Sequence, residues 1–267
     1  MNYNFIITEE CNVICKYCVF PKIENPHTAT MEVLQKHLPY IKELEISGYM
    51  DVQGGEIGLV PDDILEYFFV IMDTKMFVST NGLFLNKIDK FKKYIDIVQW
   101  HVTPTPMKSL LIPDVNHDEL FISKGIVHDD IDDMVEFIKS NKNIQFHYID
   151  FEYDIEQHIE YNAIKYIKLY RKIKDLKNLS DDAKERIKGR TVENLNRRRC
   201  MEENDSILID LVNEKICLCQ RNMHVNVSLT KENLERRMET KPRDFFDLSD
   251  TTCKSCGRLY EGKTRRL

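Results

Sequence analysis

The sequence lacks a hydrophobic run long enough to cross a membrane. Its longest apolar stretch, near residues 64–72, is short and is interrupted by Glu66, whereas a spanning helix needs about 20 apolar residues. The N-terminus also lacks the charged and then apolar pattern of a signal peptide. We therefore expect a soluble, cytoplasmic protein with no membrane partner.

Internal repeats and low-complexity tracts are missing as well, and the formal net charge of −6 gives the chain no general basic character. A basic surface is the usual mark of a nucleic-acid-binding protein, so we expect no nucleic-acid partner. The charge is uneven, however, because residues 165–199 hold 13 lysines and arginines against 5 acidic residues. This basic stretch could bind an acidic leader peptide or a phosphate group of the substrate. The alternative is a solvated helix face without a binding role.

The composition of the 267 residues, 42% hydrophobic and 31% charged, allows one substantial core and a smaller extension. Short runs of β-branched and aromatic residues alternate with longer amphipathic stretches, which is typical of βα units with a largely parallel sheet. The predicted strands are residues 3–8, 43–47, 75–79, 97–102 and 144–149, and the predicted helices are residues 31–44, 62–72, 87–94, 129–140 and 155–174. This series fits either an open doubly wound sheet or a partial barrel.

The highly charged residues 175–199 are interpreted as a linker or a solvated helical connection between a core, residues 1–174, and a C-terminal unit, residues 200–267. In that unit, residues 206–212 and 215–219 flank Asn213 and Glu214 and predict a β-hairpin. A helix near residues 230–238 and a cysteine-bearing tail follow.

The eight cysteines are clustered and no export signal accompanies them, so metal ligation is favoured over disulfides. Cys11, Cys15 and Cys18 lie on a loop directly after the first predicted strand. Three thiolates can hold three irons of a 4Fe–4S cluster and leave the fourth iron without a protein ligand. Structural zinc is the alternative, but it needs a fourth ligand, and no Cys or His follows Cys18 before His27.

The spacing of Cys11, Cys15 and Cys18, with the aromatic Tyr17 before the last cysteine, resembles the motif of the radical S-adenosylmethionine superfamily. In that family the open iron is chelated by the amino and carboxylate groups of the cofactor. The resemblance implies an α/β fold, a partial (β/α)6 barrel related to the TIM barrel. It also implies reductive cleavage of S-adenosylmethionine to a 5′-deoxyadenosyl radical that abstracts a substrate hydrogen. An electron donor such as flavodoxin or ferredoxin would be needed, and Tyr17 is assigned to the cofactor site.

Three further segments follow in the order that this family leads one to expect. Gly54, Gly55 and Glu56 look like its Gly-Gly-Glu motif, in which glycines permit close backbone approach and the acidic side chain can accept from an ammonium. Ser79 and Asn81, in a segment similar to the family's Thr-Asn-Gly, are assigned as cofactor contacts, although plain turns explain both segments. His101 ends the fourth predicted strand and is a further cofactor candidate. The alternative for His101, as for His147, is a hydrogen-bonded core histidine.

The other five cysteines resemble the auxiliary-cluster extension called a twitch domain, related to the SPASM type. The resemblance assigns a second 4Fe–4S cluster to Cys200, Cys253, Cys256 and one cysteine of the hairpin, either Cys217 or Cys219. The position relative to the turn favours Cys219, which leaves Cys217 as a candidate hydrogen-atom donor. The glycine usual at the hairpin turn is replaced by Asn213-Glu214, and asparagine tolerates the left-handed conformation that such a turn requires. A zinc ribbon is the alternative for this group.

Three functions remain open. The favoured one is modification of a ribosomally made peptide by epimerisation, crosslinking or oxidation. The second is dehydrogenation or rearrangement of a small polar molecule such as an aminosugar or a nucleotide. The third, from another class, is a zinc-stabilised binding protein.

Overall fold

The computed structural model describes residues 2–15, 18, 20, 23–44, 48–101, 121–127, 130–150, 159–192, 206–218 and 223–247. Their strands form one nine-stranded sheet with the order β6-β5-β4-β3-β2-β1-β7-β8-β9. The parallel strands are β1 (Asn2–Thr8), β2 (Met50–Gly54), β3 (Met76–Thr80), β4 (Ile95–His101), β5 (Phe121–Val127), β6 (Tyr148–Asp150) and β7 (Ser206–Asp210). Antiparallel pairing adds β8 (Lys215–Cys217) and β9 (Asn226–Ser228) beyond β7.

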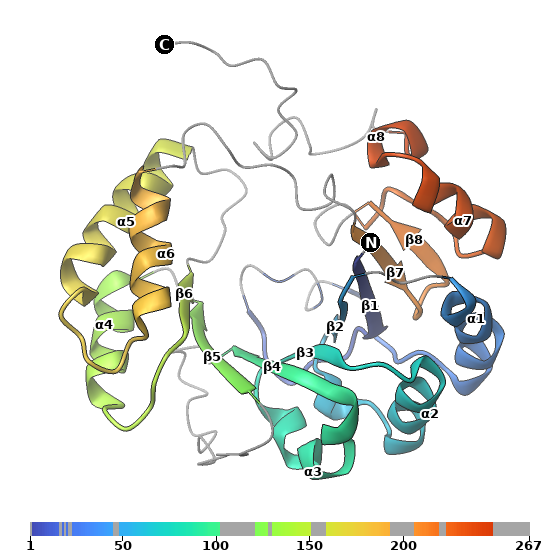
Figure 1. Ribbon diagram of the computed structural model, residues 1–267, viewed down its shortest axis with the longest axis horizontal. Coiled ribbons are helices and arrows are strands. Elements are labelled where there is room, and N and C mark those ends of the chain that lie inside the picture. The colour runs from blue at the N-terminus through green and yellow to red at the C-terminus, as the bar shows by residue number, and fades with distance from the viewer. Residues whose placement is uncertain are drawn as a thin grey trace.

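The strand order decides between the two architectures that the sequence allows. From β1 to β6 each strand pairs with the next one in the chain, so the winding never reverses. A doubly wound sheet needs such a reversal, whereas a barrel is wound in one direction. In Figure 1 the six strands follow an arc with the helices on its outer side. The sheet is a partial barrel, as the motif resemblance implied.

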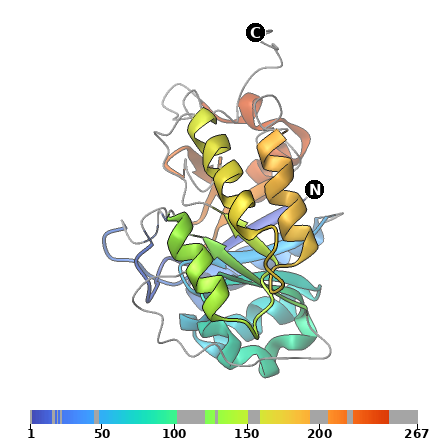
Figure 2. The ribbon, with the colours of Figure 1, turned by 90° about the vertical axis from the view of Figure 1, so that its left-hand side faces the viewer.

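Helices cover the outer side of the arc. They are α1 (Met31–Glu43), α2 (Asp62–Met72), α3 (Ile88–Phe91), α4 (Ile131–Ser140), α5 (Ile159–Ile173) and α6 (Asp181–Val192), with short 3-10 turns η2 (Ile57–Leu59), η3 (Leu83–Lys87) and η4 (Lys92–Tyr94). Near the C-terminus, α7 (Lys231–Glu239) and α8 (Pro242–Phe245) follow β9. Figure 2 shows α4, α5 and α6 together on one flank of the sheet. Among the described helices, none has the length and apolar character to cross a membrane.

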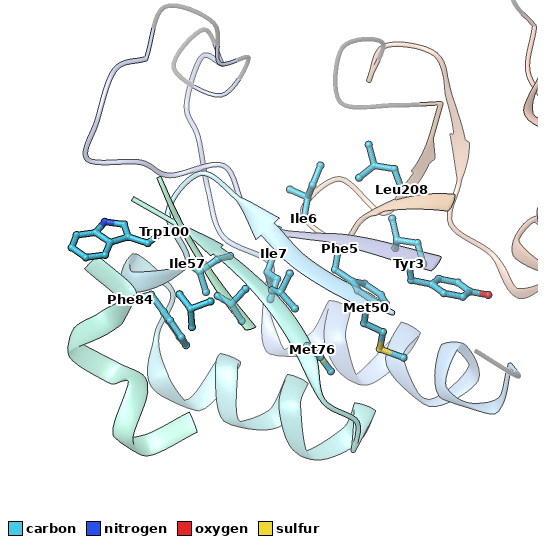
Figure 3. Close-up of a cluster of buried hydrophobic side chains, with 14 of the residues drawn as sticks. Tyr3, Phe5, Ile6, Ile7, Met50, Ile57, Met76, Phe84, Trp100 and Leu208 are labelled. Atoms are coloured by element: carbon cyan, nitrogen blue, oxygen red, sulfur yellow. The ribbon is translucent and has the colours of Figure 1, made fainter. Parts of the chain in front are cut away.

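The two faces of the sheet differ in chemistry. Phe5, Met50 and Met76 point toward the helices, whereas Ile6 and Leu208 point away from them (Figure 3). Because side chains alternate along a strand and in-register neighbours share a face, the pairing assigns strand positions to a face away from the register shifts between Ile6 and Thr8 and between Met76 and Phe77. We call the face opposite α1–α4 the inner face. The helix-facing positions are buried and mostly apolar, and the inner face carries the half-buried polar residues.

The C-terminal unit continues the core sheet. β7 pairs in parallel with β1 over Asn2–Ile6, and the predicted hairpin is present as β7 and β8. Part of the stretch expected to be a linker, residues 175–199, forms α6, whose Ala183 and Ile187 are each 1% exposed in the core. This part is therefore helical, as the second interpretation of the stretch had it, but Ala183 and Ile187 bury one side of the helix. The division into domains is otherwise a prediction.

Other sequence expectations were wrong in detail. The strand expected at residues 43–47 begins inside α1, which ends at Glu43, and residues 45–47 lie outside the described residues; the second described strand is Met50–Gly54. The sixth strand is Tyr148–Asp150, later than the predicted residues 144–149. The helix expected at residues 87–94 is broken into η3, α3 and η4. β5 was missed because Ser123, Lys124 and Gly125 interrupt its apolar pattern.

Candidate active site

The three cysteines of the first motif follow β1, at the carboxyl end of the parallel strands. All three are partly exposed and none is in a disulfide. The amide of Cys18 donates to the carbonyl of Cys15 at 3.1 Å, which folds the end of the loop back on itself. Tyr17 lies outside the described residues. Three accessible thiols at this edge suit a soft metal cluster in chemistry and in position.

Cys11 has the best defined surroundings of the three. Burial raises the pKa of its thiol, and the nearby carboxylate of Glu56 raises it further, while hydrogen bonds such as that from Asn81 oppose the shift. The Asn81 Nδ2 lies 3.7 Å from the Cys11 Sγ and also donates to the Asn12 Oδ1 at 2.8 Å. Within the part of the chain that the structure describes, no three His, Cys, Asp or Glu side chains are gathered as a metal site. The cluster assignment therefore stays a prediction that the donor chemistry fits.

The Gly-Gly pair holds the base of the cysteine loop. The amides of Gly55 and Glu56 donate to the carbonyls of Thr8 and Glu10, both at 2.7 Å. A Cβ on Gly54 would lie 2.2 Å from the Thr8 oxygen, and one on Gly55 would lie 2.0 Å from the Glu10 oxygen. Only glycine allows these approaches. The sequence led us to expect glycines that face a ligand, and the structure shows them packed against the chain's own loop.

The Glu56 side chain is engaged within the protein. It is 0% exposed, and its Oε1 accepts from the amides of Gly58 and Phe84 and from the Thr80 hydroxyl, at 2.9, 3.1 and 2.6 Å. Its Oε2 accepts from the Asn81 amide at 2.6 Å. Burial raises the pKa of this carboxyl group, and the four donors oppose that shift. Four protein donors surround this carboxylate, and its predicted contact with an ammonium group stays a prediction.

Asn81 therefore connects the third strand to the cysteine loop. The Asn81 backbone amide donates to the Glu56 carboxylate, and the Asn81 side-chain amide contacts Asn12 and Cys11. The Asn81 carbonyl accepts from the Trp100 indole at 3.0 Å. Thr80, which sequence reasoning missed, is 3% exposed and supplies the hydroxyl that binds Glu56. The sequence feature that pointed to Thr80 was its position next to Asn81 at the end of a predicted strand.

Ser79 lies on the inner face with two residues that the sequence did not single out. Its hydroxyl is 3.4 Å from the Asp51 Oδ1 on β2 and 3.4 Å from the Gln99 Oε1 on β4. Burial raises the pKa of Asp51 to about 7, against a smaller opposing effect of the Ser79 hydrogen bond. An alternating apolar and polar pattern in Met50-Asp-Val-Gln was the available signal.

His101 also lies on the inner face, in register with Gly125, which is in register with Tyr148. The Tyr148 hydroxyl lies 2.9 Å from the His101 Nδ1. The tyrosine ring crosses Gly125 so closely that a Cβ there would lie 1.8 Å from the Tyr148 Cζ. His147 is different, because its Nδ1 accepts from the Lys124 amide at 3.2 Å, which makes it a structural residue of the strand edge.

The second cysteine group is described only at Cys217. It is 2% exposed and pairs with Leu208, so it lies on the same side of the sheet as Leu208. The predicted ligands Cys200, Cys219, Cys253 and Cys256 lie outside the described residues.

The turn before Cys217 corrects one expectation. Glu214 adopts the left-handed conformation with φ 52°, the role expected of Asn213. The Glu214 carboxylate contacts His37 at 2.7 Å, and Lys36 also pairs with it. These contacts from α1 offset the backbone strain of a non-glycine residue in this region.

Asn213 links the hairpin to the cysteine loop. Its Nδ2 donates to the Glu9 Oε1 at 2.7 Å and to the Asp210 Oδ2 at 2.9 Å. Glu9 is 4% exposed and Asp210 is 1% exposed. Burial raises the pKa of Asp210, and the neighbouring Glu9 adds to the rise. One amide thus holds two buried carboxylates together across the two parts of the chain.

Solved structures share this architecture. anSMEcpe with bound AdoMet is 15% identical, with a TM-score of 0.65 over 96% of this chain and 82% of that chain. Streptococcus suis SuiB bound to the precursor peptide SuiA is 12% identical, with a TM-score of 0.57 over 97% of this chain and 66% of that chain. Both are radical S-adenosylmethionine enzymes. The chain has the radical S-adenosylmethionine fold. Neither a protein-family model nor a curated protein sequence matches it.

Within this fold, the sequence-predicted residues divide into two groups. Cys11, Gly54–Glu56 and Asn81 are joined by hydrogen bonds at the carboxyl ends of β1, β2 and β3. Ser79 and His101 lie on the inner face, where they contact Asp51, Gln99 and Tyr148 instead. The first group supports the cysteine loop, and the second is available to a molecule inside the arc.

Proposed function

We propose that this protein is a radical S-adenosylmethionine enzyme. The observation that carries the proposal is the three-cysteine loop at the carboxyl end of β1, held by Gly55, Glu56 and Asn81 within the radical S-adenosylmethionine fold. Cys11, Cys15 and Cys18 would ligate a 4Fe–4S cluster. A bound cluster and cofactor would supply reductive cleavage of S-adenosylmethionine and a 5′-deoxyadenosyl radical that takes a hydrogen atom from the substrate.

The chain's own residues would position these groups. Gly54 and Gly55 fix the base of the cysteine loop, and the Asn81 amide provides a hydrogen bond to the Cys11 sulfur, a contact of the kind that tunes cluster potentials. With the Glu56 carboxylate occupied, backbone groups of residues 54–56 are the better candidates for contact with the cofactor's amino group. The apolar core behind β1–β4 limits access of water from the helix side.

We further propose that the substrate is a peptide. One solved structure shows SuiB bound to the precursor peptide SuiA. Another shows anSMEcpe with AdoMet and the Cp18Cys peptide; this protein is 14% identical to our chain, with a TM-score of 0.57 over 96% of this chain and 87% of that chain. Both are similar to this chain in fold. The second candidate is a small polar molecule such as an aminosugar, which the half-buried polar residues Asp51, Ser79 and Gln99 favour.

The remaining assignments complete the proposal. Cys200, Cys219, Cys253 and Cys256 would hold a second 4Fe–4S cluster in a twitch-like unit at residues 200–267, with Cys217 as a hydrogen-atom donor. Zinc is the competing metal for that unit. A flavodoxin or ferredoxin would supply electrons, and a cytoplasmic location would keep the thiols reduced.

Iron analysis and cofactor cleavage test the proposal directly. After anaerobic purification, the protein should contain about eight irons per chain if both sites hold 4Fe–4S clusters. With S-adenosylmethionine and dithionite it should release 5′-deoxyadenosine, and Cys11→Ala should abolish this release. Cys217→Ala should keep the iron content, because Cys217 is assigned no ligand role. Two zinc ions per chain and no 5′-deoxyadenosine would refute the assignment.

A further inference from the structure

Across strands β1 to β5, the inner face holds one acidic side chain, Asp51, and no protein cation neutralises it in the described part of the chain. Asp51, on β2, is in register with Asn4 on β1 and Phe77 on β3. It alternates with Met50 and Val52, which are 5% and 0% exposed on the helix side. The Asp51 side chain therefore points to the inner face, where it remains partly exposed.

The hydrogen bonds of Asp51 are few for a carboxylate. Its partner among the described residues is the Ser79 hydroxyl, at 3.4 Å. That hydroxyl has a single hydrogen and is equally distant, at 3.4 Å, from the Gln99 Oε1, so it cannot serve both acceptors fully. A carboxylate has about four acceptor sites. Partly buried polar groups are normally paired, and this one has most of its capacity unused.

The side chains around Asp51 on the inner face of β1 to β5 also supply no positively charged lysine or arginine. The inner-face positions are residues 2, 4, 6 and 8 on β1, residues 51 and 53 on β2, and residues 77 and 79 on β3. On β4 they are residues 97, 99 and 101, and on β5 residues 121, 123 and 125. They include no lysine and no arginine. Such a surface repels a phosphate or a carboxylate and attracts a cation. Residues 165–199 hold 13 of the 38 lysines and arginines, and the inner-face lysine Lys215 lies on β8, beyond β1 and β7 from Asp51.

We propose that the inner face binds a primary ammonium group of the substrate, with Asp51 as its counter-ion and Ser79 and Gln99 as neighbouring acceptors. An ammonium carries three donors and no acceptor, which matches a carboxylate, a hydroxyl and an amide oxygen. The proposal rests on the proposed function and narrows its substrate. A lysine side chain of a peptide and an aminosugar both supply this group, whereas a phosphorylated nucleotide does not.

The raised pKa of Asp51 agrees with this assignment. Burial without a cation leaves the carboxyl group with a pKa of about 7, so the ionised form is poorly stabilised in the free protein. A nearby positive charge stabilises that form. Binding of the ammonium would therefore complete an ion pair that the protein alone does not provide.

Matched probes that differ only in charge test the proposal on the full chain with its clusters reconstituted anaerobically. One pair is acetyl-Ala-Lys-Ala-amide and the same peptide with norleucine, and the other is glucosamine and glucose. Binding is measured by calorimetry and by the 13C signal of the Asp51 carboxyl group, identified by its loss in Asp51→Asn. The control is Asp63→Asn, at an exposed position on α2.

The expected result is a preference for the charged member of at least one pair, by about tenfold or more. Asp51→Asn should reduce that preference to less than about threefold, whereas Asp63→Asn should keep it. Preference for lysine indicates a peptide source, and preference for glucosamine alone indicates a sugar. Equal binding within both pairs, a preference that survives in Asp51→Asn, or no binding of any charged probe at about 10 mM would overturn the proposal. Binding needs no cofactor cleavage, so release of 5′-deoxyadenosine without substrate tests the proposed function separately.

Discussion

The Glu56 carboxylate gives the sharpest test of how the site is built. In Glu56→Gln, the Oε1 keeps its three donors, but an NH2 group replaces the Oε2 and faces the Asn81 amide, now 2.6 Å from that atom. The variant loses one hydrogen bond to a charged group, about 1.5–3 kcal/mol, and leaves a buried N–H without an acceptor, about 1–3 kcal/mol more. A loss of roughly 2.5–6 kcal/mol lowers the melting temperature by about 5–24 °C in a chain of this size.

Differential scanning calorimetry of anaerobic protein measures this shift. Glu66→Gln on α2 is the matched control, because Glu66 has a side chain that is 59% exposed and pairs with Lys90 at 3.4 Å. A surface ion pair contributes about 0–1 kcal/mol, so this control should melt within about 4 °C of the unchanged protein. If Glu56→Gln melts with the control, the four-donor arrangement contributes little and our account of the Gly-Gly-Glu segment is wrong.

Three further predictions follow from the buried polar groups. The unchanged protein should lose stability as the pH rises from about 4 to 8, because burial raises the pKa of Asp51 to about 7 and the folded state disfavours its charged form. Asp51→Asn removes this loss, so its melting temperature relative to the unchanged protein should be higher at pH 8 than at pH 5. Melting curves at the two pH values measure the difference. Gly125→Ala should destabilise the protein by more than Tyr148→Phe. The alanine methyl group would collide with the Tyr148 ring, whereas Tyr148→Phe loses only the hydroxyl contact with His101. Thermal melts of the two variants measure the difference. Asn213→Ala should cost more stability at pH 8 than at pH 5, because the Asn213 hydrogen bonds favour the ionised form of the buried Asp210 and oppose the rise of its pKa. Urea titrations at both pH values measure this difference.

Local patterns predicted the local elements well. The helix expected at residues 62–72 has those bounds, with Asp62 and Asp63 in its first turn, where acidic residues favour a helix start. The first strand and the hairpin were also found, because each has a short apolar run beside a clear boundary. Strand β2 was misplaced because helix α1 extends to Glu43 and only five residues form the strand.

Contacts between distant segments could not be read from the sequence. The donors to Glu56 come from residues 58 and 80–84, and their convergence depends on the turn after β3. The contact of Tyr148 with His101 requires β4, β5 and β6 in register, and the middle strand was not predicted. The sequence therefore identified the motif residues but not which of them point to the inner face.

The base of the cysteine loop is one of the places where the core and the C-terminal unit make contact. On one side, Gly55 and Glu56 donate to Thr8 and Glu10. On the other side, Asn213 donates to Glu9, which lies between those two residues. Since Asn213 also binds Asp210 at the end of β7, a shift of the hairpin moves a contact one residue from the loop that carries Cys11. This hydrogen bond therefore joins the hairpin that carries Cys217 to Glu9, two residues before Cys11.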